Sequence, residues 1–418
     1  MKANLGSLKK ICIAVFILLG VLSATKLDEL KFSFDFSQFF PEEDPDLAFY
    51  DSFVEEFGTD DNFLLIAVEN KPNVFQQDFL NKFQAFSLES KGFEYVLESN
   101  SLTTLSYPLK TSFGYTTLPI VHINDSLQYQ KDWHKIQEDS LFINVLIDEK
   151  RESLVLALQT EDNLDYKQSE VLLNTIRTSL KSHDLKNYHI LGRAFFYEAI
   201  VEMQRSEVLT TTIVASILVF IILLLVYRSL PVVLISVFSI AMSLLLFMGL
   251  LAALGKELNA MAAFYPVLML IVGTSDVIHL TDSYIRKLQS GISRYASIIS
   301  SLKEVGMTTL LTSITTAVGF VTLLSSRLVS IQEFGINAAI GVLVAYTTVI
   351  LLTSSLLISL PEKKLIGRKS ISENWVNYLL KVNTFTKNYP NSIIWGTVVF
   401  TFFCFLGIYL IKTNHEFK

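Results

Sequence analysis

Seven apolar runs, each close to the length that crosses a lipid bilayer, constrain this 418-residue chain more than any other feature. A helix needs about 20 apolar residues to span roughly 30 Å of hydrocarbon. A hydrophobic fraction of 51% with only 18% charged residues agrees, because so much apolar surface needs lipid to cover it. The predicted spans are Ile11–Leu27, Leu209–Tyr227, Pro231–Leu254, Met261–Leu280, Thr308–Ser326, Phe334–Leu360 and Asn391–Ile411.

The first span has two interpretations. Lys9 and Lys10 precede a short apolar core, and Ala24 is a suitable small residue before the cut of a secretory signal peptide. The bulky Leu22 favours an uncleaved anchor instead, because cleavage sites need small side chains near the cut. We expect the anchor, with the cleaved form as the alternative.

The distribution of charge predicts which side of the membrane each segment occupies. With the N-terminus in the cytoplasm, the cytoplasmic segments hold 14 Lys and Arg, against 4 in the short outer segments. The positive-inside rule favours that orientation. Residues 26–207, with 32 acidic and 16 basic side chains, then form an acidic outer block. No basic surface patch remains for nucleic acid, so we expect no nucleic-acid partner.

The outer block has the pattern of a folded domain. Asn62–Val68 and Tyr188–Leu191 are typical of strands, and Leu141–Ile147 with Ser153–Leu158 predicts a hairpin. Asp165–Ser182 has apolar residues at helical spacing. Strands mixed with helices predict an α+β fold of the ferredoxin-like kind, built from split β-α-β units.

The predicted fold class is therefore an α-helical polytopic membrane protein with a large extracytoplasmic α+β domain. Two cytoplasmic connectors, Thr281–Gly306 and Glu362–Tyr389, carry apolar residues at helical spacing among basic ones, so we expect them to lie along the membrane surface. The predicted units are a first span (1–27), the outer domain (28–207), a five-span bundle (208–360), an amphipathic connector (361–390), a seventh span (391–411) and a short segment after it (412–418).

Two ionisable residues in the fourth span are the main candidates for function. Asp276 and His279 are three residues apart, so on a helix they lie on one face about one turn apart, with Gly273 three residues before Asp276. An ionisable residue inside a membrane costs about 2.5–3.5 kcal/mol on insertion scales and indicates a function or a partner. The pair predicts a proton relay, and Gly273 predicts close approach of a neighbouring helix.

Two other interpretations of this pair remain. If the span ends earlier, Asp276 and His279 lie at the cytoplasmic interface and only cap the helix. A metal site is disfavoured, because one Asp and one His supply two ligands where zinc sites usually use three or four protein groups. We therefore expect no metal.

The fifth span carries a stripe of small and hydroxylated residues. Such a stripe permits close helix contact and lends hydroxyl groups to a water or proton path, although packing alone also explains it. We name it the threonine stripe, and its members Thr308, Thr312, Thr315 and Gly319 recur at helical spacing, with Thr316 beside them.

Enzymatic motifs are absent from the sequence. We find no phosphate-binding loop, no Gly-x-Ser-x-Gly and no His-Glu-x-x-His. We therefore expect neither an enzyme nor a cofactor. An energised transporter with this sequence must draw on an ion gradient.

The order of these features resembles the first half of a resistance-nodulation-cell division (RND) transporter, and is most similar to the MMPL-type and Patched-like exporters of hydrophobic and amphiphilic molecules. The resemblance covers nearly the whole chain. It rests on Phe39–Pro45, Phe57–Asp61, Gly273–Leu280 and Thr312–Phe320, in this order.

The resemblance implies a secondary transporter in the bacterial inner membrane that exports lipids or other amphiphiles, driven by the proton-motive force. By position, Asp276 matches the proton-carrying carboxylate and His279 a histidine found in some members. Thr312, Thr316 and Gly319 match the fifth-span motif. Many members have glycines where this chain has Val272 and Thr274, and an aromatic residue in place of Val277, so the relay geometry can differ.

The resemblance also implies partners. Full transporters of this kind contain two such repeats, each with a porter domain. The outer α+β domain therefore resembles a porter domain, and 412–418 resembles the start of a second outer domain. We expect the bilayer, an amphiphilic cargo, and a second half-transporter chain or further copies of this one as partners. Two alternative functions share the architecture: a non-pumping lipid- or sterol-binding module of the sterol-sensing type, and an accessory for protein export similar to the SecDF group.

Overall fold

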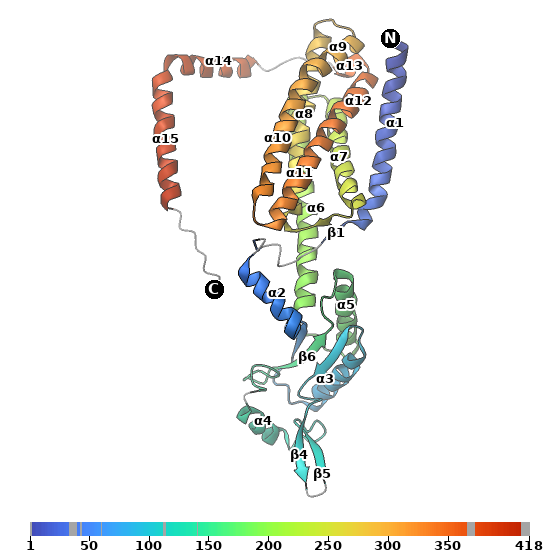
Figure 1. Cartoon of the computed structure of the whole chain (residues 1–418), viewed down its shortest axis with the longest axis vertical. Coiled ribbons are helices and arrows are strands. Elements are labelled where there is room, and N and C mark those ends of the chain that lie inside the picture. The colour runs from blue at the N-terminus through green and yellow to red at the C-terminus, as the bar shows by residue number, and fades with distance from the viewer. Residues whose placement is uncertain are drawn as a thin grey trace.

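The computed structural model describes residues 2–32, 40–41, 44–59, 61–111, 114–139, 141–365 and 373–410. A bundle of long helices occupies one end of the molecule, and a domain of strands and helices lies beyond the other end of the bundle (Figure 1). The N-terminus lies at the end of the bundle that is far from this domain. Phe39, Glu42, Glu43, Asp60 and the predicted second outer domain, 412–418, lie outside the described residues.

All seven predicted spans are confirmed as helical segments long and apolar enough to cross a membrane, so the chain is a multi-pass membrane protein. Their mean hydropathy follows from runs of Leu, Ile, Val and Phe, which need lipid or one another as neighbours. The helices that carry them are α1 (Lys2–Lys26), α6 (Arg193–Tyr227), α7 (Leu230–Ala253), α8 (Phe264–Gln289), α10 (Met307–Val321), α11 (Val329–Thr348) and α15 (Pro390–Leu410).

Small residues let neighbouring helices of the bundle approach closely. A Cβ atom added to Gly249 of α7 would lie 2.3 Å from the Cβ atom of Ser23 on α1, and one added to Gly20 would lie 2.7 Å from Met242 Sδ. At Gly249 the neighbours include the Ser23 backbone, so no larger side chain fits there, whereas at Gly20 the end of the flexible Met242 side chain must shift. The first helix is thus an integral part of the bundle.

The prediction that Thr281–Gly306 lies along the membrane surface is wrong. Helix α8 continues to Gln289, α9 (Arg294–Ser301) turns back, and a π-helical segment, η5 (Leu302–Gly306), leads directly into α10. The apolar residues of this connector form a core with α7 and α12 (Ser354–Ser359) instead of facing lipid headgroups. Tyr284, Leu288 and Ile298 are its buried members from α8 and α9.

The second connector contains two short helices, α13 (Glu362–Leu365) and α14 (Glu373–Asn388). Helix α14 lies nearly perpendicular to α15, and both stand apart from the bundle (Figure 1). This orientation agrees with the expected position along the membrane surface, which remains a prediction. The remaining short elements are η1 (Leu27–Glu29), η3 (Ser90–Gly92), η4 (Ala260–Ala263), η6 (Thr322–Ser325) and the π-helical η7 (Val349–Thr353).

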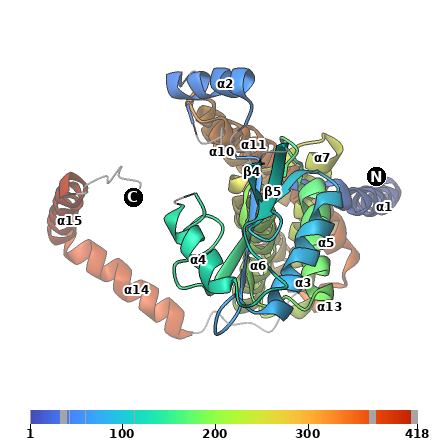
Figure 2. The ribbon, with the colours of Figure 1, turned by 90° about the horizontal axis from the view of Figure 1, so that it is seen from below.

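A four-stranded antiparallel sheet forms the centre of the predicted outer domain, with the strand order β3-β6-β2-β7. Each of the units β2-α3-β3 and β6-α5-β7 has a helix between two strands, and the two units interleave in the sheet. Both helices pack on one face of the sheet, where they form the main core (Figure 2). Their bounds are β2 Phe63–Glu69, α3 Gln77–Glu89, β3 Val96–Asn100, β6 Ser153–Thr160, α5 Tyr166–Ser182 and β7 Tyr188–Gly192.

Alternation of apolar and polar residues explains how the strands and helices meet. On β2, Leu64, Ile66 and Val68 are buried beneath the helices, while the residues between them face the other side. Asp165 begins α5 with a capping box completed by Gln168, which satisfies two backbone amides at the helix start.

The predicted hairpin of Leu141–Ile147 with Ser153–Leu158 is only half correct. Strand β6 forms, but residues 141–147 make turns, with isolated bridges from Ile147 to Ile143 and Leu154. Asn144 has a φ of 62°, which no extended strand allows, and the Asp148 carboxylate accepts backbone hydrogen bonds from Glu152 and Ser153.

The periphery of the outer domain contains a hairpin, two further helices and a strand pair next to the bundle. Asp44 caps α2 by accepting hydrogen bonds from its first amides. The short parallel pair β1–β8 joins the segment after α1 to the loop after α7. These elements are α2 Pro45–Phe57, β4 Ser106–Thr111, β5 Gly114–Pro119, α4 Tyr129–Glu138, β1 Lys31–Phe32 and β8 Glu257–Leu258.

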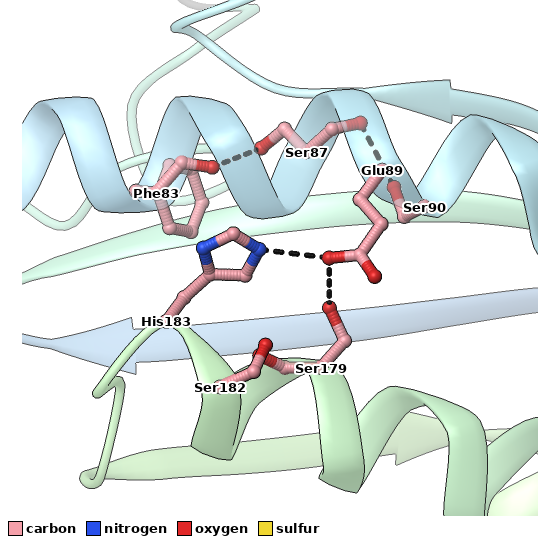
Figure 3. A network of polar contacts seen from close by, with 7 residues as sticks. All are labelled: Phe83, Ser87, Glu89, Ser90, Ser179, Ser182 and His183. Atoms are coloured by element: carbon pink, nitrogen blue, oxygen red, sulfur yellow. Dashed lines mark hydrogen bonds and ion pairs between the residues drawn. The ribbon is translucent and has the colours of Figure 1, made fainter.

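Polar side chains tie the helices of the outer domain together. Glu89 at the end of α3 accepts hydrogen bonds from Ser179 Oγ of α5 and from Nε2 of His183, the residue after α5, both at 2.7 Å (Figure 3). The Ser179 bond, followed by the His183 bond, lowers the pKa of Glu89, because both stabilise the charged carboxylate. Arg177 of α5 donates two hydrogen bonds to the buried Glu198 of α6, which links this domain to the long helix entering the bundle.

Candidate functional site

A pocket of about 230 Å³ lies between α8 and the η5–α10 segment, within the described part of the bundle. Its walls are mostly polar, which is unusual among apolar spans. Helix α8 contributes Ser275, Asp276, His279 and Arg286; η5 contributes Glu304 and Val305; α10 contributes Thr308, Thr309 and Thr312.

Asp276 is the most buried acidic group of this pocket. It is the thirteenth residue of the 26-residue helix α8, and only 4% of its surface is exposed. Its Oδ2 atom is buried and has no hydrogen-bond partner among the described residues. A buried carboxylate oxygen without a partner is costly when charged. Asp276 is therefore the strongest candidate for a functional ionisable residue in the described part of the bundle.

The helix does not end at Asp276, as the capping interpretation requires. Helix α8 continues to Gln289, and the span that contains Asp276 extends over Met261–Gln289. His279 lies one turn further along and lines the same pocket, where it is exposed. The structure thus brings the two predicted relay residues to one pocket.

Charged residues stand at the end of the pocket nearest the α8–α9 turn. Arg286 and Glu304 line it there, and Glu304 forms an ion pair of 2.6 Å with Lys287. This end of the bundle is also the end where the N-terminus lies (Figure 1). Asp276 therefore has a polar route toward that side of the molecule.

The threonine stripe only partly meets the pocket. Thr308 and Thr312 line it, whereas Thr315, Thr316 and Gly319 do not. Within this chain the stripe makes no close helix contact, because Thr308, Thr312, Thr315 and Gly319 are exposed and a Cβ atom added to Gly319 would meet nothing within 4 Å.

The packed face of α10 is the neighbouring one. It consists of Thr309, Ser313 and Ala317, which recur every four residues and are buried. Sequence alone did not separate the two faces, because both carry small and hydroxylated side chains at the same spacing. The π-helical segment before α10 fixes which of them faces the bundle.

The hydroxyl groups of the stripe are engaged with their own helix. Thr308 donates to the Glu304 carbonyl at 3.0 Å, and Thr312 donates to the Thr308 carbonyl at 3.1 Å. Their oxygen lone pairs stay free to accept a hydrogen bond from the pocket. They can therefore accept from water or from a protonated carboxyl group, but their own hydrogens are already used.

Gly273 lies on the buried side of α8. A Cβ atom added there would lie 3.3 Å from Ile240 Cγ2 of α7 and 3.6 Å from Val349 Cγ2 of η7. The helix that carries Asp276 thus approaches both neighbours closely. A larger residue at position 273 would push α8 away from them.

Four polar residues of the pocket were not predicted from the sequence, namely Ser275, Arg286, Glu304 and Thr309. Arg286 and Glu304 belong to the connector that was predicted to lie on the membrane surface. Arg286 lies further along α8 than Asp276, and Glu304 lies in η5 just before Thr308. The sequence places them near Asp276 only if the helix is known to continue through both segments. No group of three or more His, Cys, Asp or Glu suited to a metal ion occurs in the described parts of the chain.

Comparison with known proteins gives one family. The model of the MMPL family matches residues 142–385, which is more than half of the chain and includes every residue of the pocket. The chain belongs to the MMPL family. A comparison with curated proteins finds no match. MMPL proteins are RND-type transporters of hydrophobic substrates and not hydrolases, which fits the prediction that the chain is not an enzyme.

Proposed function

We propose that this MMPL protein exports lipids or other amphiphilic molecules across the bacterial inner membrane, driven by the proton-motive force. The observation that carries the proposal is Asp276, a carboxyl group buried at the middle of a spanning helix with an unpartnered oxygen beside a polar pocket. Taking up a proton removes the cost of that buried charge, and releasing it restores the cost. Such a group gives the bundle two states of different energy.

The other pocket residues have supporting roles in this proposal. His279 passes protons between Asp276 and the cytoplasm, since it lies one helical turn further along α8 and lines the same pocket. The free lone pairs of Thr308 and Thr312 accept a hydrogen bond from the protonated carboxyl group or from water. Gly273 permits the close packing that keeps α8 in contact with α7.

The outer domain is proposed to be a ferredoxin-like porter domain outside the cytoplasmic membrane, with the N-terminus in the cytoplasm. The interleaved β-α-β units support that assignment. Helix α6 runs without interruption for 35 residues from the sheet into the bundle (Figure 1). A movement of the bundle is therefore passed to the outer domain through a continuous helix and the Arg177–Glu198 pair.

A second half-transporter chain, or another copy of this chain, is the proposed partner. The exposed face of α10 formed by the threonine stripe supports this, because it presents hydroxyl groups beside the pocket and is left uncovered in one chain. Polar groups in a membrane favour contact with another helix over contact with lipid.

The test compares two carboxyl groups on the same helix. Asp276→Asn removes the proposed proton carrier, whereas Asp282→Asn removes an exposed carboxylate that pairs with Arg286 at 3.1 Å. In proteoliposomes with an imposed pH gradient, an NBD-labelled phospholipid reports transport and an enclosed pH indicator reports proton flow. We expect Asp276→Asn to abolish both and Asp282→Asn to retain both. Gradient-dependent movement in the Asp276→Asn protein would refute the proposal.

The lipid-binding alternative predicts a different result from the same samples. A non-pumping module binds the labelled lipid equally well with or without a gradient, and equally well in the Asp276→Asn protein. A protein-export accessory would instead leave lipid movement unchanged and reduce secretion in cells that carry the variant.

A further inference from the structure

Three consecutive carbonyl groups of the π-helical segment η5 receive side-chain hydroxyls. Thr308 donates to the Glu304 carbonyl at 3.0 Å, Thr309 to the Val305 carbonyl at 3.0 Å, and Tyr346 to the Gly306 carbonyl at 2.9 Å. A π turn holds one residue more than an α turn and disturbs the regular backbone pairing. Hydroxyl groups that bind its carbonyls therefore stabilise it.

Tyr346 differs from the two threonines because it comes from another helix. Its position is on α11, and its hydroxyl reaches across to Gly306, whereas Thr308 and Thr309 bond to carbonyls three or four residues earlier in their own helix, including a 3.3 Å bond from Thr309 to the Gly306 carbonyl. A threonine can make that local bond in any helical register. The Tyr346 bond exists only where Gly306 faces α11, so it selects this register.

The register of η5 determines which residues of α10 face Asp276. Helix α9 is fixed to the end of α12, because Arg294 donates to the carbonyls of Ile358 and Leu360. If η5 became α-helical, α10 would rotate relative to α9 by about one residue, which is about 100°. Thr312 would then take the present place of the buried Ser313, and Leu311 would take the place of Thr312 in the pocket.

We infer that Tyr346 is a positioning residue for the Asp276 site, holding η5 in the register that presents Thr308 and Thr312 to the carboxyl group. The inference rests on the proposed function and adds to it the element that can move. The two registers are discrete, since one residue must be gained or lost in the turn, so η5 can act as a two-state element beside the proton carrier.

The test uses cysteine reactivity as a measure of register. In full-length protein with Cys12→Ala and Cys404→Ala, single cysteines are placed by Leu311→Cys, which enters the pocket only in the alternative register, and by Ser275→Cys, which lines the pocket from α8 in either register. A charged, water-soluble thiosulfonate reagent labels cysteines that water reaches. The ratio of the two labelling rates therefore reports the population of the alternative register.

We compare Tyr346→Phe with Thr347→Val, which removes a hydroxyl that donates only within α11. A net hydrogen bond is worth about 0.5–1.5 kcal/mol, which corresponds to roughly a two- to tenfold change in an equilibrium. We expect Tyr346→Phe to raise the Leu311→Cys rate, relative to the Ser275→Cys rate, by that factor, and Thr347→Val to leave it unchanged.

Two results would overturn the inference. An unchanged ratio in Tyr346→Phe, even with lower thermal stability, would leave Tyr346 a structural contact only. An equal rise in both variants would show that any lost hydroxyl on α11 loosens the pocket. Neither result bears on proton coupling, whose own test is transport by the Asp276→Asn protein, so the two failures are distinguishable.

Discussion

The crossing of α1 and α7 gives a prediction that the structure quantifies directly. Gly249→Ala adds a Cβ atom 2.3 Å from Ser23 Cβ and 2.7 Å from Ser23 Cα, which belongs to the backbone. Carbon atoms in contact normally lie about 3.5–4.0 Å apart. The two helices must therefore separate by more than about 1 Å, which opens gaps along the crossing. Overpacking of this kind costs about 1–3 kcal/mol.

Gly319→Ala is the matched control, because a Cβ atom at that position of α10 meets nothing within 4 Å. Both substitutions replace a helical glycine with alanine and share a gain in helix propensity of up to about 1 kcal/mol. The difference between them isolates the clash. We expect the free energy of unfolding of Gly249→Ala to lie about 1–3 kcal/mol below that of Gly319→Ala.

The assay is denaturant unfolding of both proteins in detergent micelles, followed by the helical circular dichroism signal. Equal stabilities, within about 0.5 kcal/mol, would refute the reasoning, since the first helix would then not pack against α7. The same comparison separates the two interpretations of the first span. A chain that has lost its first helix has no Ser23 for the new side chain to meet.

Three further predictions concern the outer domain. Because the pKa of Glu89 is lowered, its contribution to stability is present above the ordinary glutamate range and is lost as the pH falls through the lowered value. Ser179→Ala removes one of the hydrogen bonds that lower this pKa and should therefore reduce the free energy of unfolding at neutral pH. The difference from the wild-type protein should shrink when unfolding is measured at acid pH. Glu198→Ala removes two hydrogen bonds that Arg177 donates, and should lower the free energy of unfolding by about 2 kcal/mol. Limited proteolysis should then cleave faster between α5 and α6, and an unchanged cleavage rate would contradict this. Phe83 is 0% exposed, so Phe83→Ala should lower the free energy of unfolding by about 3–5 kcal/mol. Phe49 is 72% exposed, so Phe49→Ala should change it little. Similar losses of thermal stability in the two variants would contradict this prediction.

The spans were predictable from the sequence because a bilayer demands length and apolar character, and both are visible in a single chain. Asp276 and His279 were found for the same reason, since an ionisable residue stands out in an apolar run. The continuation of α8 beyond Leu280 to Gln289 was not predicted. Tyr284 and Leu288 have the spacing of a surface helix, and only the presence of α9 and α12 makes that face a core.

The packed face of α10 was not predictable. Thr308 and Thr309 begin two adjacent stripes with nearly the same side chains, and the sequence does not say which stripe faces the bundle. The π turn at Leu302–Gly306 decides this by shifting the helix by one residue, and a π turn has no reliable sequence pattern. The contribution of Tyr346, 40 residues away from Gly306, was hidden for the same reason.

The most direct measurement of the central claim asks whether Asp276 carries a proton inside the membrane. Dicyclohexylcarbodiimide reacts with protonated carboxyl groups in apolar surroundings, and mass spectrometry locates the modified residue. In proteoliposomes we expect labelling of Asp276 that declines as the pH is raised, and no labelling of the exposed Asp282. An unlabelled Asp276 at every pH, or equal labelling of both residues, would contradict the account.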